Sequence, residues 1–496
     1  MRVQAVFALN DSSPFSTDVR ELLAAHNVAV VPWDRLDRLR FDAAVTASEN
    51  TELSAINAPV LVLPHGVGFH KALPNSRGNG RRLSGSVRPA DLLGRPVQIA
   101  VTHPDQAEQL TAYVPESRGR TVVVSDPIRQ RLAASRVLRQ RYRTALGVDG
   151  RRLVVVGSTW GSQSLLGRWP DLLVRLLAEL DMDRYQVASI MHPNIVAHGA
   201  WQLRSWWSAA RAAGLIMVPS QAGWPAALLA ADCLIGDHGS VSLYGASIDV
   251  PLLLAEFGDE VVPGTPMTQL GGMAARFDPT ASLAAQVDAA IETHLPNRYA
   301  AAVDAAFAPE PLARSLRSVL YELIDLPVPR GVPPLLAWPP MRPAVTDPAS
   351  WVVHTRIVGE TVEVRRFPAA VQALVPEPAA GWWRHLATSD DEWDLRVLQS
   401  ASVILRTALS TVDVAERWAV EALQQFPGCL LAAAAIADGA IVAVRDRAVV
   451  VVRNGGSGAL ASAAYVYAWL RADRVPPEDG ALRWGNATVP VAIGPG

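Results

Sequence analysis

Cysteine is scarce in this sequence: only Cys233 and Cys429 occur among 496 residues, and they lie far apart in the chain. Two distant thiols exclude a disulfide framework, and we interpret both as small buried hydrophobes in a reducing cytoplasm. Long apolar runs are also missing, because none approaches the ~20 residues needed to span a bilayer. The chain reaches Asn10 and Asp11 too early for a secretory signal peptide. We therefore expect a cytoplasmic protein with no transmembrane segment.

A strong excess of either charge is lacking as well. The chain has 45 basic and 47 acidic residues, which argues against broad electrostatic capture of nucleic acid. Half of the residues are hydrophobic and 19% are charged, a balance typical of a well-cored globular protein and not of a disordered one. At this length we expect about three domains.

Short apolar runs that alternate with helical stretches fill the first two thirds of the chain. Residues 59–63 read Pro-Val-Leu-Val-Leu, which is typical of a strand buried on both faces of a parallel sheet. A turn at 147–150 separates two such series, so we predict two Rossmann-like domains, at 1–146 and 147–326, facing each other across a cleft. Further strands are expected at 3–9, 28–31, 43–46, 97–101, 121–124, 152–156, 187–191, 215–218, 233–235 and 251–254, and closing helices at 282–294 and 296–326.

The composition changes after residue 326. Seven prolines between 327 and 343 indicate a stiff, extended linker. Residues 344–496 are predicted to form an accessory α+β domain, with a largely helical stretch at 393–426 and apolar strands at 429–452. Its glycine-rich turn at 454–458 lacks the GKS/T ending of a P-loop, so we interpret it as a flexible connection. The sequence of this domain does not indicate its role. The role that we consider is binding of a protein partner.

One stretch stands out in the second domain. The apolar run at 233–235 ends in Gly-Asp-His-Gly-Ser, and a helix is expected directly after it. A tight turn before a helix presents free backbone N–H groups and the positive end of the helix dipole to an anion. This pattern predicts a phosphate-binding segment at Asp237, His238, Gly239, Ser240 and Ser242. From these residues alone, an ordinary turn with a serine N-cap is an equally good interpretation.

Other polar residues also follow expected strands, which is where ligands bind in open α/β sheets. His65 and Gly66 come after one strand, Lys71 stands six residues beyond His65, and Thr159 and His192 follow two strands of the second domain. Histidine is suited to proton transfer because its ordinary pKa lies near 6.5. Each residue alone would fit a structural role in its turn, whereas the set together favours a functional site.

Five segments, taken in order, carry a family resemblance. They are His65-Gly66 with Lys71, Ser125-Asp126-Pro127, Ser158-Thr159-Trp160, His192-Pro193, and Asp237-His238-Gly239-Ser240. Together they resemble the CDP-glycerol glycerophosphotransferases of teichoic-acid synthesis, which have the GT-B fold. That family carries an HG…K turn, a strand end of the G-x-P-R/D type, a P-T-W segment, an H-P pair and a D-Y-S-S segment. The likeness covers residues from about 40 to 260, within a GT-B-like region of 1–326.

The resemblance implies a transferase that moves a glycerophosphate, alditol-phosphate or sugar group from a CDP- or UDP-linked donor to a hydroxyl acceptor. It assigns His65 as general base on that hydroxyl, with Gly66 and Lys71 on the acceptor side. It places His192 and Ser240 at the donor phosphates, with Thr159 beside them. No metal ion and no cofactor is implied, because helix dipole and histidine can stabilise the charge of the leaving group.

The sequence departs from the family pattern at three places. Lys71 stands six residues after His65 instead of five, Gly161 replaces an arginine, and Asp-His-Gly-Ser replaces D-Y-S-S. These departures leave two alternatives open: a catalytically inactive GT-B scaffold that binds a protein partner, and a UDP-sugar 2-epimerase-like enzyme. The epimerase needs carboxylates at the cleft, for which Glu256 is the candidate. In a transferase, Glu256 is expected at the nucleotide ribose.

Overall fold

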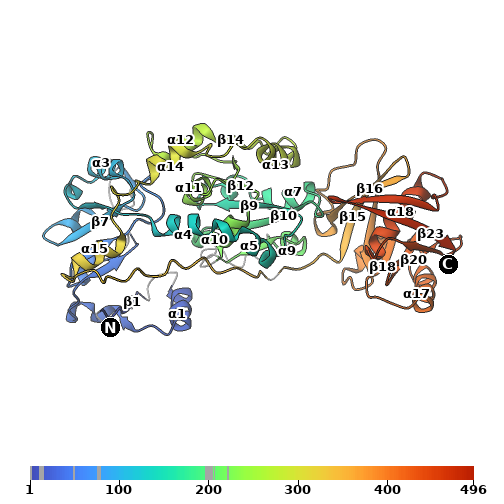
Figure 1. Ribbon diagram of the computed structural model, residues 1–496, viewed down its shortest axis with the longest axis horizontal. Coiled ribbons are helices and arrows are strands. Elements are labelled where there is room, and N and C mark those ends of the chain that lie inside the picture. The colour runs from blue at the N-terminus through green and yellow to red at the C-terminus, as the bar shows by residue number, and fades with distance from the viewer. Residues whose placement is uncertain are drawn as a thin grey trace.

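The computed structural model describes residues 3–10, 16–48, 51–74, 80–195, 205, 207–219, 223–343 and 345–495. Within these ranges the chain forms three bodies that follow one another along the long axis of the molecule (Figure 1). The first unit is built on four parallel strands, the second unit on six parallel strands, and the barrel on a closed sheet of nine strands. The predicted α/β class, with two Rossmann-like units and a further α+β module, is confirmed.

The first unit has a small parallel sheet. Its elements are β1 (Phe7–Leu9), α1 (Ser16–Ala25), β2 (Val30–Pro32), β3 (Ala44–Thr46), β4 (Val60–Val62), β5 (Ala72–Pro74), β6 (Arg81–Leu83), α2 (Pro89–Leu92), β7 (Val97–Val101), α3 (Pro104–Tyr113) and β8 (Thr121–Val123). The sheet order is β3-β4-β7-β8, and all three residues of the apolar β4 are buried. β1 and β2 pair with each other in a separate two-stranded sheet.

The second unit is a larger doubly wound sheet. Its elements are α4 (Pro127–Ser135), α5 (Arg139–Leu146), β9 (Arg152–Ser158), α6 (Leu165–Arg168), α7 (Leu172–Glu179), β10 (Tyr185–Met191), α9 (Ser208–Ala212), β11 (Ile216–Val218), α10 (Trp224–Ala230), β12 (Cys233–Gly236), α11 (Ser240–Ser247), β13 (Leu252–Leu254), α12 (Pro266–Met273), β14 (Ala275–Arg276), α13 (Leu283–Glu292) and α14 (Ala300–Ala306). The parallel strands follow the order β11-β10-β9-β12-β13-β14. Helices lie on both faces, and the central strands β9 and β10 are accordingly buried at every position except Arg152.

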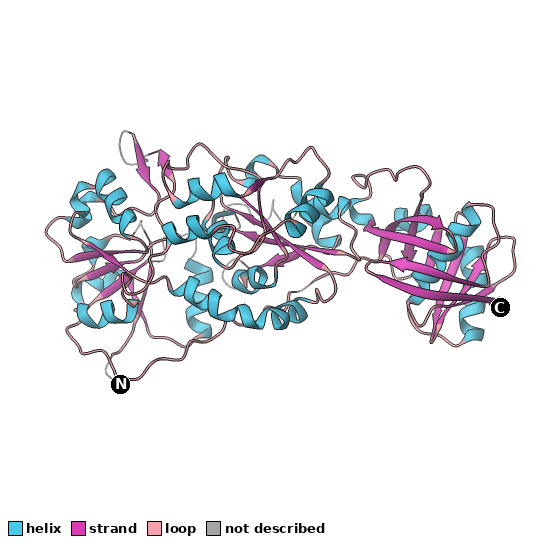
Figure 2. Ribbon diagram, turned by 45° about the horizontal axis from the view of Figure 1, so that its top comes forward, coloured by secondary structure: helices cyan, strands magenta, loops and turns pink. Residues whose placement is uncertain are grey.

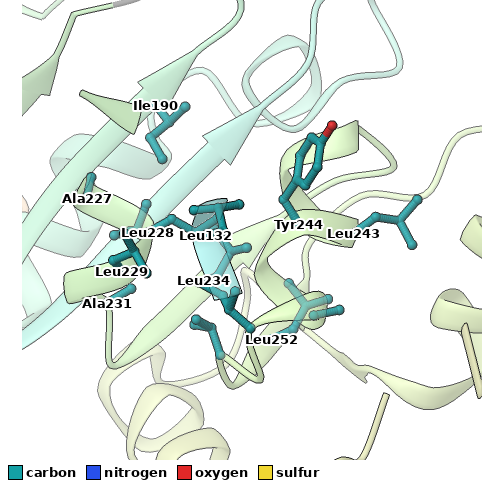
Figure 3. Close-up of a cluster of buried hydrophobic side chains, with 14 of the residues drawn as sticks. Leu132, Ile190, Ala227, Leu228, Leu229, Ala231, Leu234, Leu243, Tyr244 and Leu252 are labelled. Atoms are coloured by element: carbon teal, nitrogen blue, oxygen red, sulfur yellow. The ribbon is translucent and has the colours of Figure 1, made fainter. Parts of the chain in front are cut away.

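The two helices that precede the turn at 147–150 pack on the second unit. Leu132 of α4, which precedes the turn at 147–150, packs with Leu228 of α10 and Leu234 of β12 in the core of the second unit (Figure 3). Burial of one such leucine side chain contributes about 1.5–3 kcal/mol. Arg143 of α5 adds an ion pair, 2.7 Å from Asp232 just before β12. The helices α4 and α5 therefore belong to the packing of the second unit.

The chain returns to the first unit at α15 (Leu316–Leu323). Val319 packs there with Leu61 of β4 and Ala100 of β7. The helix expected at 296–326 is thus wrong as one element: α14 packs on the second unit and α15 on the first. Pro309 and Pro311 lie in the break, where proline removes the N–H that a continuous helix would use.

The proline-rich linker lies along the second unit and has no helix or strand among its described residues. The hydroxyl of Tyr142 donates to the carbonyl oxygen of Trp338 at 2.8 Å. The guanidinium of Arg131 sits 3.9 Å from the centre of a Trp338 ring, a cation–π contact. Met341 packs so closely on Gly223 that a Cβ at that glycine would lie 2.5 Å from its sulfur. The linker is therefore a packed strap on this unit.

The barrel encloses a helix (Figure 2). Its elements are β15 (Ser350–Val358), β16 (Thr361–Pro368), β17 (Trp383–Ser389), α16 (Leu395–Ser400), β18 (Val403–Arg406), α17 (Val412–Gln425), β19 (Leu431–Ile436), β20 (Gly439–Val444), β21 (Val450–Arg453), α18 (Gly458–Arg471), β22 (Asp479–Trp484) and β23 (Ala487–Pro495). Every residue of α18 from 459 to 469 is buried, and all nine strands contribute side chains to the cluster around it. A helix that is apolar all round needs such an enclosure.

The stretch at 393–426, expected to be largely helical, contains the strand β18 between α16 and α17. Its three apolar residues at 403–405 are fully buried between β17 and β19, and such a short run does not distinguish a strand from a helix by its period. Cys233 and Cys429 are both buried and free, in different bodies. None of the described helices has both the length and the apolar character needed to cross a membrane.

Candidate active site

The residues singled out from the sequence gather where strands of the two units end. In the second sheet, β10 lies on one side of β9 and β12 on the other, so the loops after β9 and β12 diverge at a topological switch point. Thr159 directly follows β9, Asp237 follows β12, and His192 follows the adjacent β10. His65, three residues after β4, comes from the first unit.

Asp237 organises the turn after β12. It is buried, and its carboxylate accepts hydrogen bonds from the backbone N–H groups of Thr159 at 2.8 Å, Leu165 at 3.0 Å and Gly239 at 2.9 Å. The Ser242 hydroxyl donates to the Asp237 carbonyl oxygen at 2.5 Å. The Asp237 carboxylate therefore joins the loop after β9 to the loop after β12, while Ser242 bonds within the latter segment.

Ser240 begins helix α11 and faces the first unit. The N-cap is Gly239 and makes no side-chain capping bond, so the alternative of a serine N-cap is wrong. Instead the Ser240 hydroxyl oxygen accepts a hydrogen bond from the backbone N–H of Val67 in the first unit, at 3.0 Å. Gly66 makes this approach possible: it has a φ of +100°, and a Cβ there would lie 2.4 Å from the Ser240 hydroxyl oxygen.

Replacing Gly66 by alanine is expected to destabilise the fold by more than G94A does. Both glycines have positive φ, which costs an L-residue about 1–2 kcal/mol, but a Cβ at Gly94 meets open space. G66A also forces Ser240 away, so urea unfolding should show a further loss of about 1 kcal/mol or more. A matching loss in the two variants would show that the contact with Ser240 is unimportant.

His65 is the exposed member of the site. Its Nδ1 lies 3.3 Å from the carbonyl oxygen of Ala47. A carbonyl only accepts, so Nδ1 carries the proton and Nε2 presents its lone pair. The ring lies 6.4 Å from that of His192, centre to centre, across the junction of the two units. A histidine held in this tautomer can accept a proton at Nε2.

His192 has the opposite tautomer. Its Nδ1 accepts the backbone N–H of Asn194 at 3.2 Å, so the proton is on Nε2. Burial, together with the nearby His65 and Lys71, lowers its pKa to about 4. The ring is therefore neutral at pH 7 and can donate its Nε2–H to an anion. Trp160, whose ring centre lies 6.3 Å away, is 44% exposed beside it.

Lys71 reaches from the first unit into the loops of the second. Its Nζ donates to the Thr159 hydroxyl at 2.8 Å and lies 3.4 Å from a carboxylate oxygen of Glu260. The same carboxylate oxygen is 2.6 Å from Nε2 of the fully buried His238, whose Nδ1 accepts the N–H of Gly258 at 3.2 Å. Both ring nitrogens of His238 are thereby used within the protein.

Glu260 is the site residue that sequence reasoning missed. The predicted carboxylate, Glu256, lies nearer the end of β13 and makes a 3.8 Å ion pair with Arg168, which is largely exposed. Glu260 sits in the irregular stretch between β13 and α12, where no periodicity marks a position. The sequence signal that could have found Glu260 is its position in the loop after β13, because the loops after β9, β10 and β12 in the same sheet also carry site residues.

No protein-family model matches the chain, and no curated protein matches it. Its structure is similar to the wall teichoic acid polymerase TagF, with a TM-score of 0.42 and 15% identity, covering 65% of this chain and 87% of that one. It is also similar to HepE from Anabaena, solved in complex with UDP and glucose, with a TM-score of 0.36 and 14% identity over 61% and 88% of the two chains. A glycosyltransferase from Rickettsia africae matches with a TM-score of 0.34 and 13% identity over 66% and 85%.

The strand-end motifs resemble those of teichoic-acid transferases, and TagF is one of the structures to which this chain is similar. At this level of similarity, the fold class rests on the two parallel sheets themselves.

Proposed function

We propose that the protein is a GT-B-like transferase that uses a nucleotide-activated donor, linked to CDP or UDP, and a hydroxyl acceptor. The observation that supports this most is the meeting of His65 and His192, 6.4 Å apart, at strand ends of two different units. Two complementary tautomers, one accepting and one donating at Nε2, suit a step that moves a proton and stabilises a leaving anion.

The donor diphosphate is proposed to bind at the switch point of the second sheet. The amino end of α11 begins there at Ser240, His192 offers its Nε2–H, and Lys71 brings an ammonium group beside Thr159. These groups stabilise the negative charge that grows on the leaving nucleotide. Asp237 is proposed to hold the loops after β9 and β12 in place, and Ser242 to fix the backbone of Asp237.

His65 is proposed to take the proton of the acceptor hydroxyl at Nε2. For an alditol-phosphate donor, the acceptor oxygen then bonds to the distal phosphorus, and the nucleoside monophosphate leaves with the electron pair. For a sugar donor, the oxygen bonds to the anomeric carbon and the nucleoside diphosphate leaves. Because such donors occur in the cytoplasm, we propose that compartment for the protein.

Isothermal titration with CDP, UDP and GDP tests the proposal. We expect one of them to bind, and at ~100 times its dissociation constant to add about 2.7 kcal/mol to the free energy of unfolding. The variant H192A should bind that nucleotide about tenfold or more weakly, because it loses a hydrogen bond to a charged group. H26A, which removes an exposed imidazole outside the site, is the matched control. Failure of all three nucleotides to bind wild-type protein at millimolar concentration would remove the proposal.

The two alternatives from the sequence are separated by the same variants. An inactive scaffold keeps its cellular role when both His65 and His192 are replaced by alanine. An epimerase needs carboxylates that face its substrate, whereas Glu260 is paired with His238 and Lys71. A protein partner for the barrel remains a prediction.

A further inference from the structure

Lys71 is the only lysine in the sequence; the other 44 of the 45 basic residues are arginines. Arginine presents a broad planar fork with a fixed charge, whereas lysine presents a compact charge whose pKa responds to burial. The side chain of Lys71 is only 11% exposed and lies at the junction of the two units. The one position that uses lysine is thus a largely buried position in the candidate site.

Paired backbone segments from the two units bring Lys71 and Glu260 together. The N–H of Ala72 donates to the carbonyl oxygen of Glu260 at 2.8 Å, and the N–H of Val262 donates to that of His70 at 2.9 Å. These bonds flank an antiparallel bridge between Lys71 and Val261. The segment after β13 is therefore fixed against the segment before β5, and the two side chains are held in register.

His238 fixes the carboxylate end of this arrangement. Because its Nδ1 accepts from Gly258, its proton is on Nε2, and that N–H donates to Glu260 at 2.6 Å. A Cβ at Gly258 would lie 3.1 Å from Cε1 of His238, so the glycine allows the close approach. The bond from His238 thereby fixes the carboxylate oxygen of Glu260 that contacts Lys71.

We propose that His238 and Glu260 are positioning residues that keep the Lys71 ammonium directed at Thr159, so that the first unit supplies a cation to the donor phosphates bound by the second. This inference rests on the proposed function. It gives a reason for histidine at 238, where the resembled segment has tyrosine: His238 acts through Glu260, and its ring nitrogens do not face the donor. Neither Glu260 nor His238 is proposed to touch the reacting atoms.

The charges around Lys71 set the sign of the expected effect. Burial lowers the pKa of Lys71, while the carboxylates of Asp237 and Glu260 raise it. Burial alone would raise the pKa of Glu260, but its bonds with His238 and Lys71 bring it below its ordinary value. Removing the charge of Glu260 therefore lowers the pKa of Lys71 further. The titratable groups that interact with Lys71 are Asp237, Glu260, His70 and His192, and His238 contacts Glu260.

The single lysine makes a direct test possible. Protein labelled with ¹³Cε-lysine gives one lysine side-chain resonance that needs no assignment, and its shift is followed against pH in wild type, E260Q and H238Q. We expect the midpoint to move to lower pH in E260Q and to stay near wild type in H238Q, since glutamine can still donate to Glu260. E260D, which withdraws the carboxylate by one methylene, should move the midpoint in the same direction and serves if E260Q does not fold.

Binding of whichever nucleoside diphosphate the titration identifies provides the second readout. E260Q should weaken it about tenfold in the wild-type background and have little effect in a K71M background, because Glu260 acts through Lys71. An unchanged lysine midpoint in folded E260Q, or an equal loss of affinity in both backgrounds, would overturn the inference. Absence of nucleotide binding by wild type would instead remove the proposed function, while the resonance would still test the positioning of Lys71.

Discussion

Replacing His65 by alanine is expected to lower the rate of group transfer by about 10²–10⁴-fold, the range for loss of a general base, with little change in nucleotide affinity. The reason lies in the geometry. The Nδ1 of His65 is hydrogen-bonded to Ala47, so the lone pair of Nε2 is the group available to the acceptor. The donor contacts proposed for His192, Lys71 and Ser240 do not include His65.

The measurement is nucleotide release from CDP-glycerol or UDP-glucose with glycerol as acceptor, together with titration of the free nucleotide. H65Q keeps a polar side chain but cannot accept the proton at neutral pH, so it should be as slow as H65A. H26A should match wild type, since that imidazole is exposed outside the site. A rate for H65A within a few-fold of wild type, alongside active wild-type enzyme, would assign the general base elsewhere.

Local signals in the sequence were enough to locate most of the site. An apolar run followed by a polar residue marks the end of a buried parallel strand, and this pattern predicted the positions of His65, Thr159, His192 and Asp237. The strands β4, β9, β10 and β12 end immediately before them or within three residues. The carboxyl ends of parallel strands lie at one edge of a sheet. Residues that each follow such a strand are therefore close in space, although they are far apart in the sequence.

The remainder depended on contacts between distant segments. Glu260 is placed by backbone pairing with residues 70–72, and no local period encodes that pairing. The Ser240 hydroxyl accepts from Val67 instead of capping its own helix, because Gly66 lets the first unit approach. Likewise, the return of α15 to the first sheet follows from burial of Val319 beside Leu61, a tertiary contact. Closure of the barrel around α18 also joins strands far apart in sequence.

The second large effect is expected at His385, on β17 of the barrel, and concerns stability against acid. Its ring is buried and stacked on Tyr467 of α18, with 3.8 Å between ring centres. Neither ring nitrogen has a hydrogen-bond partner among the residues that the structure describes. Burial, together with the nearby His354, lowers the pKa of His385 to about 3. The folded barrel thus holds a neutral imidazole without polar partners.

The variant H385F is therefore expected to resist acid better than wild type. Between pH 6.5 and about 3 the unfolded chain binds a proton at this histidine and the folded chain does not, so wild-type stability falls as the pH falls through that window. The difference corresponds to roughly 4–5 kcal/mol at the acid end, at about 1.36 kcal/mol per pH unit. Phenylalanine keeps the stacking and does not titrate, so urea unfolding of H385F should show a shallower loss of stability from pH 7 to 4 than wild type. The control H26Q should lose stability over this range as wild type does. Parallel pH profiles for H385F and wild type would show that the His385 ring is solvated or hydrogen-bonded in solution.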